Sequence, residues 1–424
     1  MEKNIILKGN ICYSKDSSRI VIRENSFLIC KDGKSEGVFE QIPEEYRNFE
    51  LQDYGNALII PGCVDLHLHA SQFAFRGFGM DLELLDWLNT ITFPEEAQYQ
   101  EAEYAQRAYH IFADTIKKSE TTRAVIFGTI HTDATIQLMD EMEKTGIKTY
   151  VGRVNMDRNA PDILCEKSAD ISLEETEKWI DQTSQRYENV KPILTPRFVP
   201  SCSNELLCGI GKLQKKYGLS VQSHLSENPS EVSWVQELHP DTSCYGEAYD
   251  KYGLFGENGK TIMAHSVYSD EKEIELLKKR GVWVAHCPQS NINLSSGIAP
   301  IRTYLDRGIR VGLGTDLAAG FSISILRAMG EAIQMSKMRW RLIDTNQKPL
   351  RLEEAFFLGT KGGGSFFGKV GSFEKGYEMD AVVLDDTTLP YPHPLSVRQR
   401  LERMIYLSDD RHIKAKFVCG KQIF

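Results

Sequence analysis

PGCVDLHLH, residues 61–69, is the most informative stretch in this chain of 424 residues. An apolar run that ends in two histidines is typical of a short strand that leads into a polar site. Side chains at positions i and i+2 of a strand point to the same face, so His67 and His69 project together, as two ligands of one metal ion must. An isolated His-x-His pair also fits two ordinary polar residues, so the interpretation depends on the rest of the chain.

Strand-like segments recur after residue 69 and alternate with helical ones. Besides 63–69, they occupy residues 122–130, 149–155, 191–198, 220–227, 261–267, 282–288 and 310–316. Strands separated by helices in this way indicate a parallel α/β architecture whose site lies at the carboxyl ends of the strands. We therefore predict a TIM-like (β/α)8 barrel. Capping boxes at Ser172 with Glu175 and at Asp270 with Glu273 predict the starts of two helices, and Gly281 ends the second.

The two ends of the chain differ from this middle part. Short β-branched runs separated by Gly, Ser, Asp and Lys fill both the start and the end of the sequence, which is the pattern of small strands. We predict that residues 1–60 and 370–424 together form a small β-sandwich domain. Residues 61–369 would then form the barrel.

Three further candidate metal ligands stand at the ends of later strands. His224 lies near the end of VQSHLSE, His265 ends TIMAH and Asp316 ends VGLGTD. The carboxyl ends of parallel strands meet at one edge, so we expect these three side chains to converge with His67 and His69. Imidazole and carboxylate ligands without thiolate suit a catalytic Zn²⁺ site, and Fe²⁺ is the alternative.

Four more residues are candidates for proton transfer and substrate binding. Glu227, three residues after His224, could shuttle protons beside a metal-activated water, or it could simply cap the next helix. Gln72 can offer a donor and an acceptor to a planar ring, Arg197 can bond a carbonyl oxygen and a ring nitrogen, and Phe198 can cover a flat ring. A salt-bridged arginine and a core phenylalanine are the alternative. His286 ends another strand and could face the site as well.

Composition excludes several classes of protein. The chain carries 50 basic and 59 acidic residues, a formal charge of −9, which argues against general nucleic-acid binding. The sequence has neither a signal-peptide pattern nor an apolar run long enough for a membrane span, so we expect a cytoplasmic protein that does not bind membranes. Nine scattered cysteines without C-x-x-C argue against disulfides and against a thiolate zinc site. H-x-E…P-C-x-x-C, P-loop and H-E-x-x-H motifs are absent from the sequence.

The motifs PGCVDLHLH, SHLSE, MAH and GLGTD, in this order, resemble the amidohydrolase superfamily of metal-dependent hydrolases. The resemblance covers nearly the whole chain, and HASQFAFRG, LLDWLNTITFPEE and TPRF are similar to its purine-deaminating members. It implies hydrolytic deamination of guanine to xanthine and ammonia in a homodimeric enzyme of purine metabolism. Another ring substrate (an oxidised purine, a pyrimidine or a triazine) and a non-catalytic scaffold with the same fold are the alternatives.

The resemblance also implies a role for each candidate residue. The metal ligands would be His67, His69, His224, His265 and Asp316, with a single zinc per subunit because the fourth strand ends in Arg197-Phe198 and offers no lysine. The catalytic residues would be Glu227 as proton shuttle, Asp316 as acceptor of a proton from water, and His265 beside the oxyanion. Guanine would contact Gln72, Arg197, Phe198 and His224.

Overall fold

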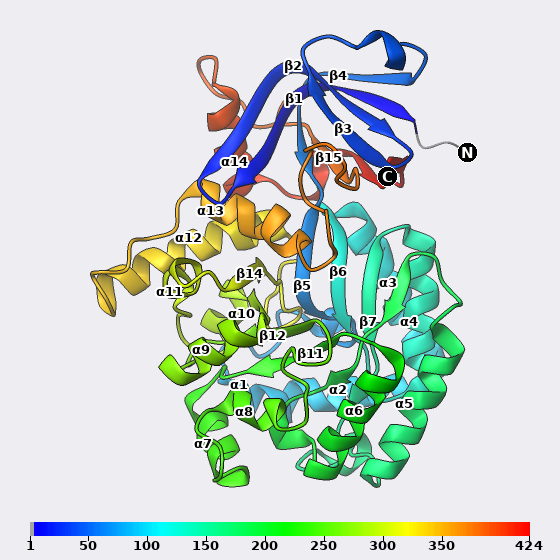
Figure 1. Ribbon diagram of the computed structural model, residues 1–424, viewed down its shortest axis with the longest axis vertical. Helices are drawn as coiled ribbons and strands as arrows, with labels where there is room; N and C mark the ends of the chain where they lie inside the picture. The colour runs from blue at the N-terminus through cyan, green and yellow to red at the C-terminus, as the bar shows by residue number, and fades with distance from the viewer. Residues whose placement is uncertain (1–3) are drawn as a thin grey trace.

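The computed structural model describes residues 4–424, which form a sheet made from both ends of the chain and a larger α/β body (Figure 1). Residues 1–3 of the expected 1–60 unit lie outside the described residues. Strand β4 (Glu50–Pro61) is followed after one residue by β5 (Cys63–His69), so the chain passes directly from the sheet into the body. The amino ends of the body's parallel strands therefore face the sheet, and their carboxyl ends point away from it.

One continuous sheet joins the two ends of the chain. Its strand order is β17-β16-β15-β4-β1-β2-β3, and β4 pairs parallel with β1 and antiparallel with β15. The strands of both chain ends are thus hydrogen-bonded in one continuous order, and their arrangement as a two-layered sandwich stays a prediction. Besides β4, the strands of this sheet are β1 (Ile5–Asp16), β2 (Arg19–Lys31), β3 (Lys34–Phe39), β15 (Ala381–Leu384), β16 (Ile413–Val418) and β17 (Lys421–Gln422).

The body contains two four-stranded parallel sheets, β5-β6-β7-β9 and β11-β12-β13-β14, and a short pair, β8 with β10. Each of the eight segments expected to be extended contains strand, although the third and the fourth are each broken into two short pieces. The strands that follow β5 are β6 (Thr121–Phe127), β7 (Lys148–Gly152), β8 (Val154–Asn155), β9 (Val190–Pro192), β10 (Thr195–Pro196), β11 (Val221–Leu225), β12 (Thr261–His265), β13 (Trp283–His286) and β14 (Arg310–Leu313).

Backbone hydrogen bonds connect the two parallel sheets at both edges. At one edge the amide of Gln222 donates to Leu194 O (3.0 Å). At the other, the amide of Asp316 donates to His67 O (2.8 Å) and that of His69 to Leu317 O (3.0 Å). The segment after β14 is therefore bonded directly to the histidine-bearing end of β5, which brings residues about 250 positions apart into one site.

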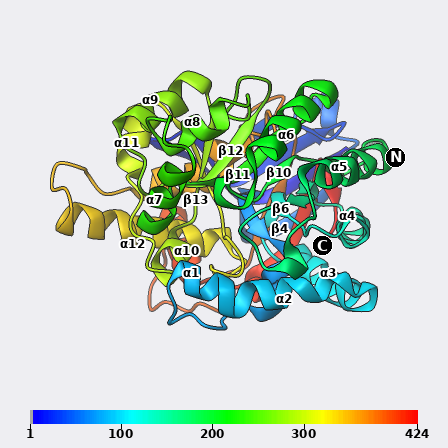
Figure 2. The same ribbon diagram turned by 90° about the horizontal axis from the view of Figure 1, so that it is seen from below.

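Helices cover the outside of the body, and Figure 2 views it from the carboxyl ends of the strands, where α1 lies beside α10. The α-helices are α1 (Leu84–Trp87), α2 (Phe93–Ala97), α3 (Ala102–Lys118), α4 (Thr132–Thr145), α5 (Ala169–Thr183), α6 (Asn204–Tyr217), α7 (Pro229–Leu238), α8 (Tyr245–Asp250), α9 (Glu271–Arg280), α10 (Pro288–Asn293), α11 (Ile301–Asp306), α12 (Ile325–Leu342), α13 (Leu352–Phe357) and α14 (Val397–Leu407). Shorter turns are the 3₁₀ segments η1 (Glu44–Tyr46), η2 (Ala70–Phe75), η4 (Gln98–Gln100), η5 (Asp162–Leu164), η6 (Val199–Ser201) and η8 (Asp410–His412), and the π-helical η3 (Leu88–Thr92) and η7 (Leu358–Gly362).

Two helix starts test the capping predictions. Helix α9 begins after Asp270, whose side chain accepts a hydrogen bond from the amide of Glu273, and it ends at Gly281 in the left-handed conformation, as predicted. The predicted start of α5 at Ser172 is wrong. Ser168 is the N-cap of this helix, and Ser172 lies buried within its first turn.

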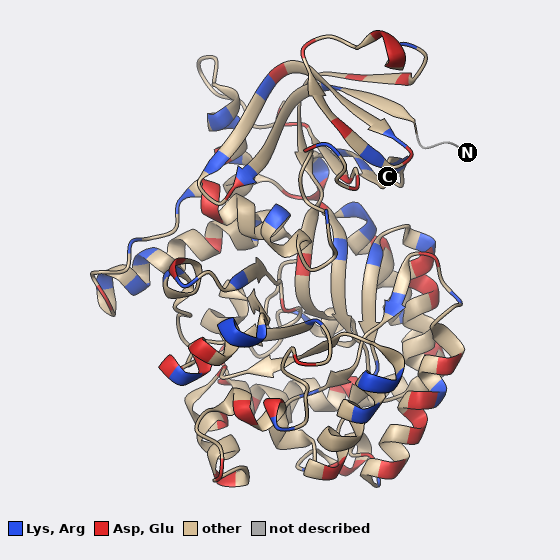
Figure 3. Cartoon of the chain, in the orientation of Figure 1, with Lys and Arg blue, Asp and Glu red and all other residues tan. Residues whose placement is uncertain are grey.

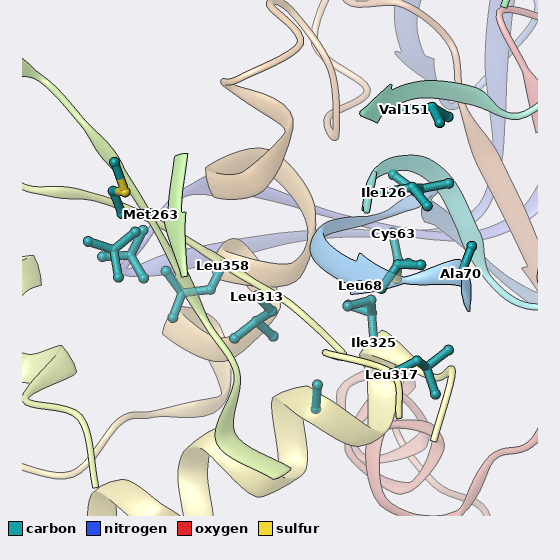
Figure 4. Packing of buried hydrophobic residues seen from close by; sticks show 14 of the residues in the cluster. Cys63, Leu68, Ala70, Ile126, Val151, Met263, Leu313, Leu317, Ile325 and Leu358 are labelled. Atoms are coloured by element: carbon teal, nitrogen blue, oxygen red, sulfur yellow. The ribbon is translucent and has the colours of Figure 1, made fainter. Parts of the chain in front are cut away.

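The core of the body lies between its strands and the surrounding helices. Figure 4 shows side chains from β5, β6 and β7 packed near residues of α12 and η7, among them Leu68, Ile126, Val151, Ile325 and Leu358, all fully buried. Acidic and basic residues are interspersed along the outer helices (Figure 3). In the part of the chain that the structure describes, no helix has the length and apolar character needed to cross a membrane.

Candidate active site

A cavity opens at the carboxyl ends of the strands. Residues from both parallel sheets and from the segment that runs from α1 into η3 line it. Polar groups occupy one part and large apolar side chains another, as in a site that binds a flat polar ring. The lining residues are His69, Gln72, Leu84, Trp87, Leu88, Arg197, Phe198, His224, Glu227, Glu231, His265, Leu294, Asp316 and Ala319.

The five expected metal ligands converge at the floor of this cavity. Asp316 Oδ1 lies 3.2 Å from His67 Nε2 and 3.5 Å from His69 Nε2, and Asp316 Oδ2 lies 3.7 Å from His265 Nε2. His69 Nε2 and His224 Nε2 are 3.2 Å apart. The candidate ligand atoms of His67, His224 and His265 all lie within 4.8 Å of one another. These distances suit a single cation shared by the group.

The donor atoms fit a divalent metal. The Nε2 atoms of His67 and His265 are buried and have no hydrogen-bond partner in the described chain, which leaves each free to coordinate an ion. The far nitrogens are held in place, since His224 Nδ1 contacts Arg197 O (2.6 Å) and His265 Nδ1 contacts Asn291 Oδ1 (2.9 Å). Such contacts orient a metal-binding imidazole.

The charge states of His67, His69, His224 and Asp316 also favour metal binding. For His265, burial alone would lower the pKa, but the carboxylates of Glu227 and Asp316 raise it. Burial lowers the pKa of His67, and it lowers those of His69 and His224 well below the ordinary value, with further repulsion from His67. Burial alone would raise the pKa of Asp316, but the neighbouring imidazoles, above all His67, hold it well below its usual range. Neutral imidazoles and an ionised carboxylate are the forms that bind metal ions.

Glu227 lies beside the His/Asp cluster but forms no hydrogen bond with Asp316. Its Oε2 lies 3.4 Å from His265 Nε2, and its Oε1 accepts a hydrogen bond from the hydroxyl of Ser296 (3.1 Å). Burial raises the pKa of Glu227 to about 7. A carboxyl group that exchanges a proton near neutral pH is suited to general acid and base catalysis.

The other wall carries the expected substrate-binding residues. Gln72, Arg197 and Phe198 all line the cavity. Gln72 and Arg197 are not independent, because both donate to the buried carboxylate of Glu96. Arg197 therefore forms the salt bridge that was the alternative interpretation, and it also lines the cavity.

Sequence reasoning missed four residues that support the site. Glu96 binds the recognition residues, and the side chains of Asn291 and Ser296 contact His265 and Glu227 as described above. Glu231 accepts from the amide of Glu227 (2.9 Å) and from the Tyr245 hydroxyl (2.8 Å), which fixes the turn that carries Glu227. The pair Asn228 and Glu231 is a capping-box signal at the start of α7 that could have identified Glu231.

His286 lies close to the site without lining the cavity. It is buried at the end of β13, and its burial lowers its pKa to about 3. The residues that line the cavity do not include it. A direct role for His286 stays a prediction, since His67, an expected metal ligand, is likewise not among the lining residues.

Two ligand positions have unusual backbone conformations. His265 and Asp316 have φ angles of 72° and 48°, in the left-handed region that side-chain-bearing residues seldom adopt. Each such conformation costs about 1–3 kcal/mol and is typically retained at functional sites. Asp65 holds the residue directly before Asp316. It accepts hydrogen bonds from both the amide (3.1 Å) and the hydroxyl (2.5 Å) of Thr315.

An α/β fold that gathers four histidines and an aspartate at the carboxyl ends of its parallel strands is that of a metal-dependent hydrolase. The comparison with family models agrees. The chain belongs to the amidohydrolase family, whose model matches residues 58–423.

Several relatives are similar over nearly their whole length. Guanine deaminase of Rattus norvegicus is 37% identical over 99% of this chain and 92% of its own length, and guanine deaminase of Escherichia coli (strain K12) is 34% identical over 95% of this chain and 91% of its own. The crystal structure of guanine deaminase from C. acetobutylicum with guanine bound in the active site has a TM-score of 0.96 and 48% identity, covering 99% of this chain and 100% of that chain.

Proposed function

We propose that this protein hydrolyses guanine to xanthine and ammonia. The observation that carries the proposal is that one cavity holds the His/Asp cluster and Glu227 together with Gln72 and Arg197. The similarity to a guanine deaminase with guanine bound supports the choice of substrate. Purine metabolism is the context in which this reaction would serve.

We propose that His67, His69, His224, His265 and Asp316 hold one Zn²⁺ per subunit, with Fe²⁺ as the other metal that this donor set accommodates. When bound, the metal supplies the Lewis acidity that makes a water molecule nucleophilic near neutral pH. Because four of the five side chains are buried and His224 is partly buried, the cavity would exclude most competing water from the ion.

The protein's own acids and bases would move the protons. Asp316 accepts a proton from the attacking water and orients the water oxygen towards C2 of the ring. Glu227 protonates N3 as the tetrahedral carbon forms. The resulting Glu227 carboxylate takes the remaining proton of the added hydroxyl group and passes it to the amine, so that the C2–N bond breaks, ammonia leaves and the C2=O bond of xanthine forms. The proton held by Asp316 then returns to Glu227. His265, which lies between the two carboxylates at 3.4 and 3.7 Å, steadies the developing negative charge.

The opposite wall would select the ring. Arg197 and Gln72 present N–H donors to the oxygen at C6, and Phe198 covers the flat face. Adenine carries an amine at this position, so donor would face donor. A mismatched buried pair costs a few kcal/mol, which corresponds to roughly 10²-fold discrimination or better.

Ammonia release from guanine by the purified protein, with and without a chelator, tests the proposal, with adenine, cytosine and 8-oxoguanine as alternative substrates. We expect rapid, chelator-sensitive turnover of guanine alone. Glu227→Gln should keep its metal and lose almost all turnover, whereas Glu237→Gln, on the exposed face of α7, should behave as wild type. Preference for another ring would refute the assignment of guanine, and a fully active Glu227→Gln variant would refute the proton shuttle.

Three further features belong to the same proposal. We infer that the two bonded parallel sheets act as a closed eight-stranded barrel formed by residues 61–369, and that residues 1–60 and 370–424 fold as one small domain. A homodimer follows from the resemblance to the family alone. Cytoplasmic location is likewise an expectation from the sequence.

A further inference from the structure

Glu96 is a buried carboxylate that connects the two polar residues of the recognition wall. It lies in α2 and is 4% exposed. Its Oε1 accepts from Gln72 Nε2 (2.8 Å) and from Arg197 Nη2 (3.3 Å), and its Oε2 accepts from Arg197 Nη1 (2.6 Å). Glu96 is not one of the residues that line the cavity, so it acts from behind Gln72 and Arg197.

These bonds fix which way the amide of Gln72 points. Gln72 Oε1 accepts from the amide of Ala318 (3.1 Å) while Nε2 donates to Glu96. A flipped amide would set its NH₂ group against the N–H of Ala318 and its oxygen against the carboxylate, so both contacts would become repulsive. The remaining N–H of Gln72 is thus available to a ligand as a donor.

The same carboxylate balances the charge of Arg197. The two side chains form a two-point ion pair that is about 95% buried on each side. A guanidinium without this partner would be a buried cation without its bonded counter-charge, and it would attract anions strongly. Guanine is neutral near neutral pH, whereas xanthine, with oxygens at both C2 and C6, is the more acidic ring and loses a proton more readily.

We propose that Glu96 is a positioning residue that sets specificity, by fixing Gln72 and Arg197 as an uncharged array of N–H donors. The array favours a neutral ring with an oxygen at C6 and disfavours the anionic form of the product. The inference rests on the proposed function, since it takes guanine as substrate and xanthine as product.

Glu96→Gln tests this inference, with Glu95→Gln as the matched control. Glutamine keeps the size of the side chain but offers one oxygen where three N–H groups need acceptors, so its NH₂ must face a donor. Glu95 is the neighbouring residue, and its carboxylate bonds to Gln98 on the surface (2.9 Å) instead. Wild type and both variants would be assayed for guanine turnover and for competitive inhibition by xanthine and by hypoxanthine at mildly alkaline pH, where xanthine is mostly anionic and hypoxanthine mostly neutral.

We expect Glu96→Gln to raise KM for guanine by about 10²-fold with a smaller effect on kcat. We also expect it to strengthen xanthine inhibition relative to hypoxanthine inhibition by at least about tenfold, because Arg197 keeps its charge. A general loss of structure would weaken both inhibitors equally. Unchanged KM and an unchanged inhibitor ratio in a folded, metal-loaded variant would overturn the inference.

Glu96→Asp separates position from charge and serves if the glutamine variant does not fold. The shorter carboxylate keeps Arg197 neutralised but cannot reach both partners, so KM for guanine should rise while the inhibitor ratio stays at the wild-type value. Wild-type KM in this variant would contradict the positioning role. If wild type itself does not deaminate guanine, the proposed function fails, which is a separate result from equal behaviour of wild type and Glu96→Gln.

Discussion

Arg123→Met should destabilise the protein by about 3–5 kcal/mol, because it leaves a buried aspartate without its partner. Arg123 lies in β6 and donates from Nε and Nη2 to Asp380 (2.5 and 3.0 Å) and from Nη2 to Glu378 (2.7 Å). Asp380 is 1% exposed, so water cannot replace the lost donors. These bonds join the α/β body to the segment that leads into β15 of the terminal sheet.

The unpaired charge accounts for most of this loss, since methionine retains much of the buried volume of arginine. The double variant Arg123→Met with Asp380→Asn should therefore regain most of the stability and lie within about 1–2 kcal/mol of wild type. Asparagine at position 380 can still accept from the amide of Cys419, a bond of 2.9 Å in the native chain. If adding Asp380→Asn restores stability to Arg123→Met, the unpaired charge of Asp380 was the cause of the loss.

Urea unfolding followed by tryptophan fluorescence measures these differences. Arg186→Met is the control, because Arg186 pairs with Asp140 at 2.7 Å with 46% of its own side chain exposed, and such pairs contribute up to about 1 kcal/mol. Turnover below the unfolding transition should be unchanged in Arg123→Met, since Arg123 lies near the amino end of β6, away from the cavity. A variant as stable as Arg186→Met would refute the reasoning.

Three further predictions concern stability and catalysis. Burial lowers the pKa of Lys416 from its ordinary 10.5 to about 7. Between pH 7 and 10.5 the unfolded chain therefore binds one more proton than the folded chain, so the free energy of unfolding rises by about 1.4 kcal/mol per pH unit as pH rises. Lys416→Met should remove this rise in unfolding curves measured across that range. Glu231→Gln should lower kcat by about 10-fold or more with metal content unchanged, because the turn carrying Glu227 loses an acceptor; unchanged kcat would argue against that support. Gly152→Ala should destabilise the fold by about 2 kcal/mol or more, measured by thermal unfolding, because the new Cβ would lie 1.7 Å from Thr195 Oγ1.

The strands and their ends could be predicted because their signals are local. An apolar run that stops at a histidine or an aspartate marks both a strand and the place where its last side chain emerges, as at His67, His265 and Asp316. The pairing along β4, by contrast, depends on contacts between residues hundreds of positions apart, for which the sequence has no periodic signal. Two separate sheets and one continuous sheet have the same local pattern, so the sequence could not predict that β4 pairs with both β1 and β15.

The supporting residues of the site were harder to predict for the same reason. Glu96 is one of two adjacent glutamates in a short helix, and what distinguishes it from Glu95 is that Gln72 and Arg197, 24 and 101 positions away, point at it. The error at Ser172 is of another kind. Ser168 and Ser172 are both competent caps, and the choice between them is made by the burial of Ser172 against Asn155 and Glu166.

The segment from α1 to α2 both forms part of the cavity wall and supports the residues that would recognise the substrate. Leu84, Trp87 and Leu88 form part of the cavity wall, and Glu96, a few residues further along, holds the recognition groups behind it. Any movement that lifts this segment to admit a ring also withdraws the carboxylate from Arg197. A ring would therefore meet the neutral array of N–H donors only while the segment rests against the cavity.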